Sequence, residues 1–322
     1  MMQAAAPVEV SSELSLRMLR RSEMLVVGYF VYTACLAVMW RLPASYQAAA
    51  LATPVLLCAL AHFETTRGNK ATGVLREFLI PGLVLIAYWQ VNWFSRGYEV
   101  ALQRRWVEWD RMILDGWHAR SAIESLGWPI PALLEFSYFM MYAIPPLALL
   151  VLYRNHLRSR VDQFLFTFLL GTLGTYALLP FVPTEAPRIA FPGQDLPSVV
   201  TLFRSLNVWL ANGYDIRTSV FPSGHVTAAF SAAFGMLLAF PARKRFSFIL
   251  LVFAAAITVT TIYGRYHYAM DALAGICMAL IACGISRRVY ATPDRVPRVG
   301  STDVTALEAA QFPHGPAKSS PK

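Results

Sequence analysis

Charged residues are scarce in this sequence. They make up 15% of its 322 residues, whereas an average globular chain carries about 25%. Hydrophobic residues account for 56% of the chain, and the mean hydropathy is +0.46. This composition excludes an ordinary soluble domain and disfavours a soluble helical bundle with a few buried helices. It favours a chain that lies mostly within a membrane.

Cysteine is also rare, and dense groups of metal-ligating residues are missing. The four cysteines all lie within apolar runs, where a thiol behaves as a small hydrophobe, so they do not indicate a redox compartment. No segment groups carboxylates and histidines as a metal site requires, and we expect neither a metal nor another cofactor. A short cleavable leader is missing as well. The first apolar run follows more than twenty mixed residues and is interpreted as a retained span.

What the sequence does contain is a series of apolar runs long enough to cross a bilayer, which takes roughly 17–25 residues for each helical span. We therefore expect an all-α, polytopic membrane helical bundle of about eight spans. The predicted spans are Met24–Trp40, Tyr46–Phe63, Phe78–Phe94, Leu133–Tyr153, Phe164–Val182, His225–Phe240, Phe246–Tyr263 and Tyr268–Ile285.

The net charge of +9 is concentrated on one side of this predicted bundle. With the N-terminus inside the cell, the inner segments hold 18 of the 28 lysines and arginines, whereas acidic and basic residues balance on the outer side. This is the positive-inside pattern, and all eight tryptophans fall on the outer side as an interfacial belt would. We expect a plasma-membrane protein with cytoplasmic termini, in contact with the bilayer and without a nucleic-acid partner.

The sequence divides into a polar lead, one membrane domain and a polar tail. Residues 1–23 form the predicted cytoplasmic lead and residues 24–286 the transmembrane domain. Residues 287–322 form a cytoplasmic tail whose composition predicts disorder. The outer segment Ser95–Pro131 has the pattern of an amphipathic helix along the membrane surface, with one face formed by Leu102, Trp106, Trp109 and Ile113.

Two short motifs on the predicted outer side suggest phosphate chemistry. His267 and Asp271 are four residues apart, so they share one face where a helix begins. A carboxylate there orients the imidazole and leaves its other nitrogen free to attack phosphorus, forming a phosphohistidine. Arg265 lies two residues before the histidine and is suited to neutralising phosphate oxygens. A His–Asp pair that only caps the helix is the simpler alternative.

The second motif is Phe221-Pro222-Ser223-Gly224-His225, which opens an apolar run. Proline at a helix start and Ser223 as a cap predict a helix N-terminus, where free backbone N–H groups favour an anion. His225 is then placed to protonate a leaving oxygen and to activate the group that attacks next. Arg188 leads the outer loop toward this motif, either as a bidentate phosphate ligand or as an interfacial anchor. Glu185 could compete for Arg188 or orient it.

Together these motifs resemble those of the type 2 phosphatidic acid phosphatase superfamily, which combines Pro-Ser-Gly-His with a later His and an Asp four residues further on. The resemblance covers about residues 74–286, with the first two spans additional. It implies a six-helix phosphatase-type core. It also implies roles for five residues: His267 as nucleophile, Asp271 as its orienting group, His225 as acid for the leaving group, and Ser223 and Gly224 as phosphate binders.

The sequence departs from the superfamily pattern at its basic positions. Phe181 stands where the first motif has Lys, and the Ser-Arg of the third motif falls on Thr260-Thr261. Arg188 follows a proline instead of preceding one, and Arg265 lies close to the histidine. These features look nearer to the inositol phosphorylceramide synthase branch, which transfers a phospho-headgroup between lipids.

The sequence thus predicts a metal-independent membrane enzyme that acts on a lipid phosphate ester at the extracytoplasmic face. Hydrolysis and transfer to an alcohol acceptor share the first covalent step, and the sequence leaves the acceptor open. A non-catalytic lipid-phosphate binder or transporter is the alternative from another class, because buried His, Arg and Asp also mark substrate pathways.

Overall fold

The computed structural model describes residues 18–94, 100–216 and 220–291, and every regular element in these ranges is helical. The chain divides into two units, Met1–Arg287 and Arg288–Lys322, and the arrangement described is that of the first. Most of both predicted tails lies outside the described residues. The elements are α2 (Arg21–Met39), α3 (Ala44–Arg67), α4 (Lys70–Val91), η1 (Asn92–Phe94), α5 (Val100–Arg111), η2 (Met112–Gly116), α6 (Ala119–Ser125), α7 (Pro129–Phe139), η3 (Met140–Tyr142), α8 (Ile144–Arg154), η4 (Arg158–Arg160), α9 (Val161–Leu178), η5 (Leu179–Phe181), α10 (Pro187–Ala190), α11 (Leu202–Tyr214), α12 (Gly224–Ala239), η6 (Pro241–Arg243), α13 (Lys244–Tyr263) and α14 (Ala269–Ala291).

The expected all-α architecture is confirmed, whereas the count of about eight spans is not. Six helices in the described ranges are long and apolar enough to cross a membrane: α2, α3, α4, α9, α13 and α14. The predicted span Leu133–Tyr153 is instead the pair α7 and α8, bent by 70°. The bend has a local cause, because α8 begins Ile144-Pro145-Pro146 and proline lacks the N–H that would continue the preceding helix.

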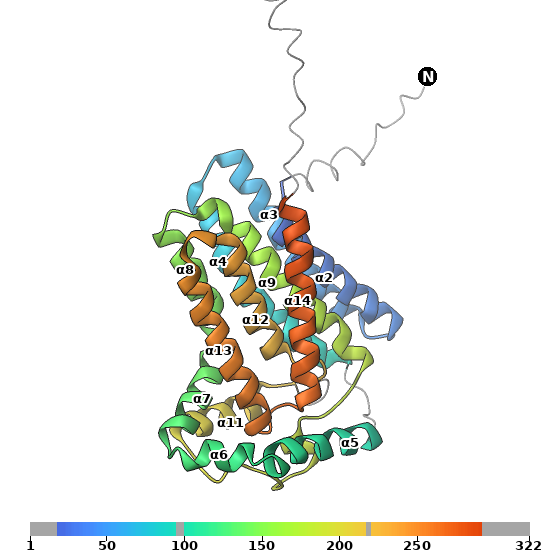
Figure 1. Cartoon of the computed structure of the whole chain (residues 1–322). Helices are drawn as coiled ribbons and strands as arrows, with labels where there is room; N and C mark the ends of the chain where they lie inside the picture. Colours follow the sequence, from blue (N-terminus) through green and yellow to red (C-terminus); the bar gives the residue numbers. More distant parts are fainter. Residues whose placement is uncertain (1–17, 95–99, 217–219, 292–322) are drawn as a thin grey trace, which may run out of the picture. The chain divides into compact units, whose positions relative to one another are not determined.

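Helix α12 has the length of the predicted span His225–Phe240 but is short for a membrane crossing. Its 16 residues rise about 24 Å, against the roughly 30 Å of a bilayer core, and it stops just before Pro241. In Figure 1 it lies inside the bundle, and it packs against α9, α13 and α8. The helix that begins at the Ser-Gly-His motif is therefore an interior element held by its neighbours.

Glycines allow this close packing around α12. A Cβ on Gly171 of α9 would lie 2.1 Å from the Ser231 hydroxyl, and one on Gly235 would lie 3.0 Å from the Phe164 carbonyl. On the other side, a Cβ on Gly275 of α14 would lie 2.9 Å from the backbone oxygen of Ser223. Small residues at such contacts let helix backbones approach closely in membranes. The contacts with α9 therefore fix the middle and C-terminal part of α12, and the contact with α14 fixes its N-terminus.

At the other end of the bundle, buried ion pairs join the first two long helices to α4. Arg76 is 2% exposed; its Nε lies 2.8 Å from Glu23 Oε1, and its Nη1 also bonds Glu64. The cluster extends to Arg20, Glu77, Tyr153 and Arg158. These contacts attach α2 and α3 to the rest of the bundle.

Replacing Arg76 with alanine is expected to lower stability by about 3 kcal/mol or more, because Glu23 would then be buried without its partner. Thermal unfolding of the purified protein in detergent measures the change. Arg67→Ala, which removes an exposed arginine from α3, is the matched control. Equal melting temperatures for the two variants would contradict a stabilising role for this cluster.

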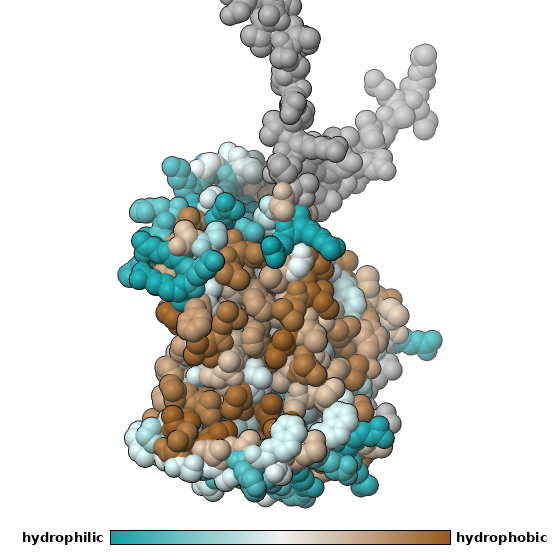
Figure 2. Space-filling view, viewed as in Figure 1, coloured by the Kyte–Doolittle hydropathy of each residue, from teal (hydrophilic) through white to brown (hydrophobic). Residues whose placement is uncertain are grey.

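The opposite end carries the short helices. Figure 1 places α5, α6 and α11 together below α13 and α14, and Figure 2 shows an apolar band between this end and the other polar end. Four exposed tryptophans lie on or beside these elements, namely Trp109 in α5, Trp117 and Trp128 on either side of α6, and Trp209 in α11, whereas the exposed Trp89 lies in α4. Trp106 does not belong to the predicted interfacial belt, because its side chain is buried (7% exposed) and its ring packs against Phe221 and Tyr268. The predicted surface helix α5 thus also contacts both motif segments.

Candidate active site

His267 lies in the tight connection between α13 and α14. The Thr261 carbonyl accepts hydrogen bonds from the backbone N–H groups of Tyr266 (2.9 Å) and His267 (3.0 Å), which ends α13 in a compact turn. Asp271, in the first turn of α14, places Oδ2 3.3 Å from His267 Nδ1 and accepts the Tyr268 N–H at 3.0 Å. The carboxylate therefore fixes the ring, and a proton on Nδ1 leaves the lone pair on Nε2.

His225 is the second residue of α12, and the first turn of that helix positions it. Ser223 is the N-cap, its hydroxyl accepting from the Val226 N–H at 3.4 Å. The ring of His225 stacks on Tyr138 with centroids 4.7 Å apart, and its Nε2 lies 3.4 Å from the Tyr142 hydroxyl. These contacts hold the imidazole from two sides.

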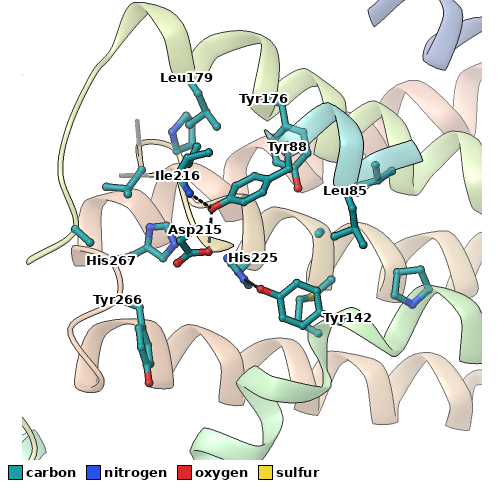
Figure 3. A pocket seen from close by; sticks show the side chains of 18 of the residues that line it. Leu85, Tyr88, Tyr142, Tyr176, Leu179, Asp215, Ile216, His225, Tyr266 and His267 are labelled. Carbon is teal, nitrogen blue, oxygen red and sulfur yellow. Dashed lines mark hydrogen bonds between the residues drawn. The ribbon is translucent and has the colours of Figure 1, made fainter. Parts of the chain in front are cut away.

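The two histidine motifs meet in space. The Ser223 N–H donates to the Asp271 carbonyl at 2.9 Å, so the start of α12 is bonded directly to the start of α14. The rings of His225 and His267 lie with centroids 6.0 Å apart, a separation that one phosphoryl group can bridge. Both rings line one cavity of about 170 Å³, and Figure 3 shows them with Asp215 between them in this view.

Arg188 reaches this cavity from α10. Its backbone N–H donates to the Arg265 carbonyl at 3.1 Å, and its Nη2 lies 3.3 Å from Asp215 Oδ2. The guanidinium also lies 5.6 Å from the centroid of the Tyr266 ring. Its Nε has no hydrogen-bond partner among the described residues. A buried guanidinium with an unused donor is suited to an anionic ligand.

The seven predicted site residues do not all face the cavity. His225, His267, Arg188 and Gly224 line it, and a Cβ at Gly224 would lie 2.9 Å from the Tyr176 ring, so only glycine fits there. Asp271 lies behind His267, whereas Ser223 is fully buried as the helix cap. Arg265 is not in the lining, and its guanidinium faces Asp110.

Asp110 of α5 holds the segment around His267 at both ends. Its Oδ2 accepts from Arg265 Nη1 at 2.7 Å, and its Oδ1 accepts from the Ala269 N–H at 2.9 Å. Asp110 and Arg265 are both fully buried. Burial raises the pKa of Asp110 to about 6, although the Ala269 N–H and Arg265 act to lower it. Arg265 thus lies in a structural ion pair beside the turn that carries His267.

Sequence reasoning missed several residues of the cavity. Asp215 follows α11, pairs with Arg188 and accepts the Tyr88 hydroxyl at 3.0 Å. No motif surrounds Asp215 in the sequence, so no local signal marked it. Tyr138 and Tyr142 were detectable, because residues four apart face the same side of a helical segment. Their aromatic rings are the contacts that orient His225.

Burial controls the ionisation of His267. Its surroundings lower the pKa to about 4, because desolvation disfavours the imidazolium; Asp215 opposes this effect and Arg188 adds to it. The ring is therefore neutral at pH 7 and has a lone pair for attack. Among the described residues, His, Cys, Asp and Glu side chains form no group of three that could hold a metal ion. The arrangement offers nucleophilic and acid–base chemistry next to a cation.

The rest of the lining is apolar. Pro81, Val84 and Leu85 of α4, Pro145 of α8 and Phe168 of α9 extend the cavity away from the histidines toward the interior of the bundle. The cavity therefore combines a polar end, where phosphate chemistry is possible, with an apolar wall.

Residues 106–285 match the PAP2 superfamily, and this match covers more than half of the chain. The chain therefore belongs to the PAP2 superfamily, whose members are phosphatases or phosphotransferases. The match begins within α5, so α2, α3 and α4 precede it. No curated protein and no solved structure matches the chain significantly.

Proposed function

We propose that this protein cleaves or transfers a phosphate ester of a membrane lipid through a phosphohistidine at His267. The observation that carries this proposal is the convergence of His267, His225 and Arg188 on one cavity, with the two rings 6.0 Å apart. Membership of the PAP2 superfamily supports the reaction class. The apolar wall of the cavity supports a lipid as substrate.

The mechanism has two steps that share the same groups. In the first, the neutral His267 Nε2 attacks phosphorus while Nδ1–H donates to Asp271. A nitrogen–phosphorus bond forms and the bond to the leaving oxygen breaks. His225, whose protonated form is favoured by the negative charge of the bound phosphate, gives that oxygen its proton. In the second, His225 takes the proton of the attacking water or alcohol, a new phosphorus–oxygen bond forms and the nitrogen–phosphorus bond breaks. Arg188 stabilises the charge on the phosphoryl oxygens in both steps.

The proposed side of the membrane is the extracytoplasmic one, with both termini in the cytoplasm. Support comes from the charge pattern, because the connections at the bundle end away from the histidines, residues 64–77, 154–162 and 241–245, hold nine lysines and arginines but only three acidic residues. Four exposed tryptophans lie in or beside α5, α6 and α11, at the same end of the bundle as the two histidines. The site would then act on lipid in the outer leaflet of the plasma membrane.

A labelled substrate tests the reaction and its acceptor together. Purified protein in mixed micelles is incubated with lipid carrying radiolabelled phosphate, with and without a long-chain alcohol. We expect the label to leave the lipid in a metal-chelating buffer as well as without chelator, because the proposed groups are all side chains. Label found in water-soluble products alone would contradict transfer, and label found on the added alcohol would contradict pure hydrolysis. Unchanged lipid in every arm would contradict the proposed function itself.

A further inference from the structure

The charge balance of the cavity bears on the kind of phosphate ester that it accepts. Among the described residues that line it, Arg188 is the one with a permanent positive charge and Asp215 the one with a full negative charge. The two form an ion pair with Nη2 and Oδ2 3.3 Å apart. The side chains are only 10% and 16% exposed, so bulk salt screens them weakly. The pair therefore offers an incoming phosphate almost no net positive charge.

Asp215 is fixed at this position. Its Oδ1 accepts the Tyr88 hydroxyl at 3.0 Å, and the same hydroxyl accepts the Ile216 N–H at 3.3 Å (Figure 3). The carboxylate is therefore held by Tyr88 of α4, whose hydroxyl is itself fixed by the Ile216 N–H, and it cannot turn away without losing the bond to Tyr88. A phosphate bound to Arg188 would lie beside this carboxylate.

We infer that Asp215 makes this site selective for a singly charged phosphodiester over a doubly charged phosphomonoester. This inference rests on the proposed function. A phosphodiester carries one negative charge at all ordinary pH values, whereas a phosphomonoester gains its second charge with a pKa of about 6. Repulsion by a nearby carboxylate in a partly desolvated site is large enough to change relative binding by about tenfold or more.

The chemistry balances for a phosphodiester in the same two steps. His267 forms the nitrogen–phosphorus bond, the oxygen of diacylglycerol leaves with the proton of His225, and the headgroup stays on the phosphoryl group. Water or an alcohol then takes that phospho-headgroup from His267. Because a phosphomonoester with the same acyl chains also releases diacylglycerol, one product measures both substrate classes.

The test compares kcat/KM for diacylglycerol release from dioleoyl phosphatidic acid and from a set of dioleoyl phosphodiesters with different headgroups, each with and without a long-chain alcohol. At pH 8 we expect wild-type protein to favour its best diester by at least about tenfold. Asp215→Asn keeps the shape and the acceptor for Tyr88, and it should reduce that preference by at least about tenfold by improving the monoester. Asp115→Asn, which removes an exposed outer carboxylate paired with Arg120, should leave the ratio unchanged.

A pH series adds an independent readout. At pH 5 most of the phosphatidic acid carries one charge, so the wild-type preference should shrink toward one, whereas the ratio for Asp215→Asn should change little. The ratio within each variant cancels changes that affect both substrates equally, such as changes in folding or in the groups around Asp215. These groups are Tyr88, Tyr138, Tyr142, Tyr176, Arg188, His225 and His267.

The possible outcomes distinguish a failure of this inference from a failure of the proposed function. Wild-type protein that prefers phosphatidic acid at pH 8, or an Asp215→Asn variant that loses both substrate classes equally, would overturn the role of Asp215. The second result would indicate a catalytic or positioning group instead. Absence of diacylglycerol from both classes would contradict the proposed function, and the inference would fall with it.

Discussion

Replacing His267 with asparagine is expected to lower kcat for lipid turnover by at least about 10³-fold, because the amide cannot form the covalent intermediate. The structure gives His267 three features of a nucleophile. Its Nδ1 lies 3.3 Å from Asp271, its ring lines the cavity, and burial lowers its pKa to about 4. Asparagine removes the imidazole but keeps a polar side chain that can still hydrogen-bond to Asp271.

His118→Asn is the matched control for this variant. His118 precedes α6 on the same end of the molecule, has a φ of 58° and is exposed, and asparagine is among the residues that tolerate this backbone conformation best. We expect its turnover to equal that of the wild type. Retained lipid binding by His267→Asn in a flotation assay, together with lost turnover, would exclude the binder or transporter alternative.

The intermediate itself provides a second measurement. Wild-type protein quenched at alkaline pH during turnover of phosphate-labelled lipid should retain acid-labile label, and His267→Asn should retain none. Full activity in His267→Asn would overturn the phosphohistidine mechanism. Loss of turnover in His118→Asn as well would show that the assay reports folding of the outer end instead of catalysis.

Replacing Asp110 is expected to have the second largest effect, although Asp110 does not line the cavity. It bonds Arg265 and the Ala269 N–H, which lie two residues on either side of His267. Alanine would leave Arg265 buried without its partner, which costs about 3–5 kcal/mol, and it would free the turn that carries the nucleophile. We expect kcat to fall by about 10²-fold in Asp110→Ala, a loss of roughly 2.7 kcal/mol, and by less in Asp110→Asn.

The pH profile separates this positioning role from general instability. Burial raises the pKa of Asp110 to about 6, so its carboxylate is ionised above that pH and neutral below it. Protonation would weaken the ion pair with Arg265. With a phosphodiester substrate, whose charge is constant, we expect kcat/KM of the wild type to fall as pH drops through about 6, well above the pKa of His267.

The variant supplies the contrast. Asp110→Asn cannot titrate, so its activity should be lower at neutral pH and lack the decline near 6. Asp195 is another carboxylate near Arg265, but it lies closer to Arg111 than to Arg265. Asp195→Asn should therefore keep the wild-type pH profile. An unchanged acidic limb in Asp110→Asn would contradict the assignment of that limb to Asp110.

The sequence predicted those parts of the structure that depend on local spacing. Apolar runs locate the long helices, because a membrane span needs a continuous apolar segment. The spacing of His267 and Asp271 predicted a shared face, and their side chains lie 3.3 Å apart. Hydrophobicity alone did not predict the bend within Leu133–Tyr153, although Pro145 and Pro146 could have indicated it.

The remaining parts depend on contacts between distant segments. Asp110 and Arg265 are 155 residues apart, and Tyr88 and Asp215 are 127 apart. Nothing local marks such pairs, because each residue alone resembles an ordinary surface charge or core aromatic. Arg265 was predicted to face phosphate because of its place beside His267, but its backbone has a φ of 62° and directs the side chain toward Asp110. Its direct contact with phosphate stays a prediction.

The hydrogen bond from the Ser223 N–H to the Asp271 carbonyl has a consequence for mutational tolerance. Both groups belong to the main chain, so at position 223 only proline would remove the donor. The separation between His225 and His267 is therefore set largely by the backbone, independently of the side chains nearby. The chain can carry Phe181 and Thr260-Thr261 where the superfamily pattern has basic residues without moving the two histidines apart. Neighbouring positions are free to diverge in charge, and with them the choice of substrate, while the reacting pair keeps its geometry.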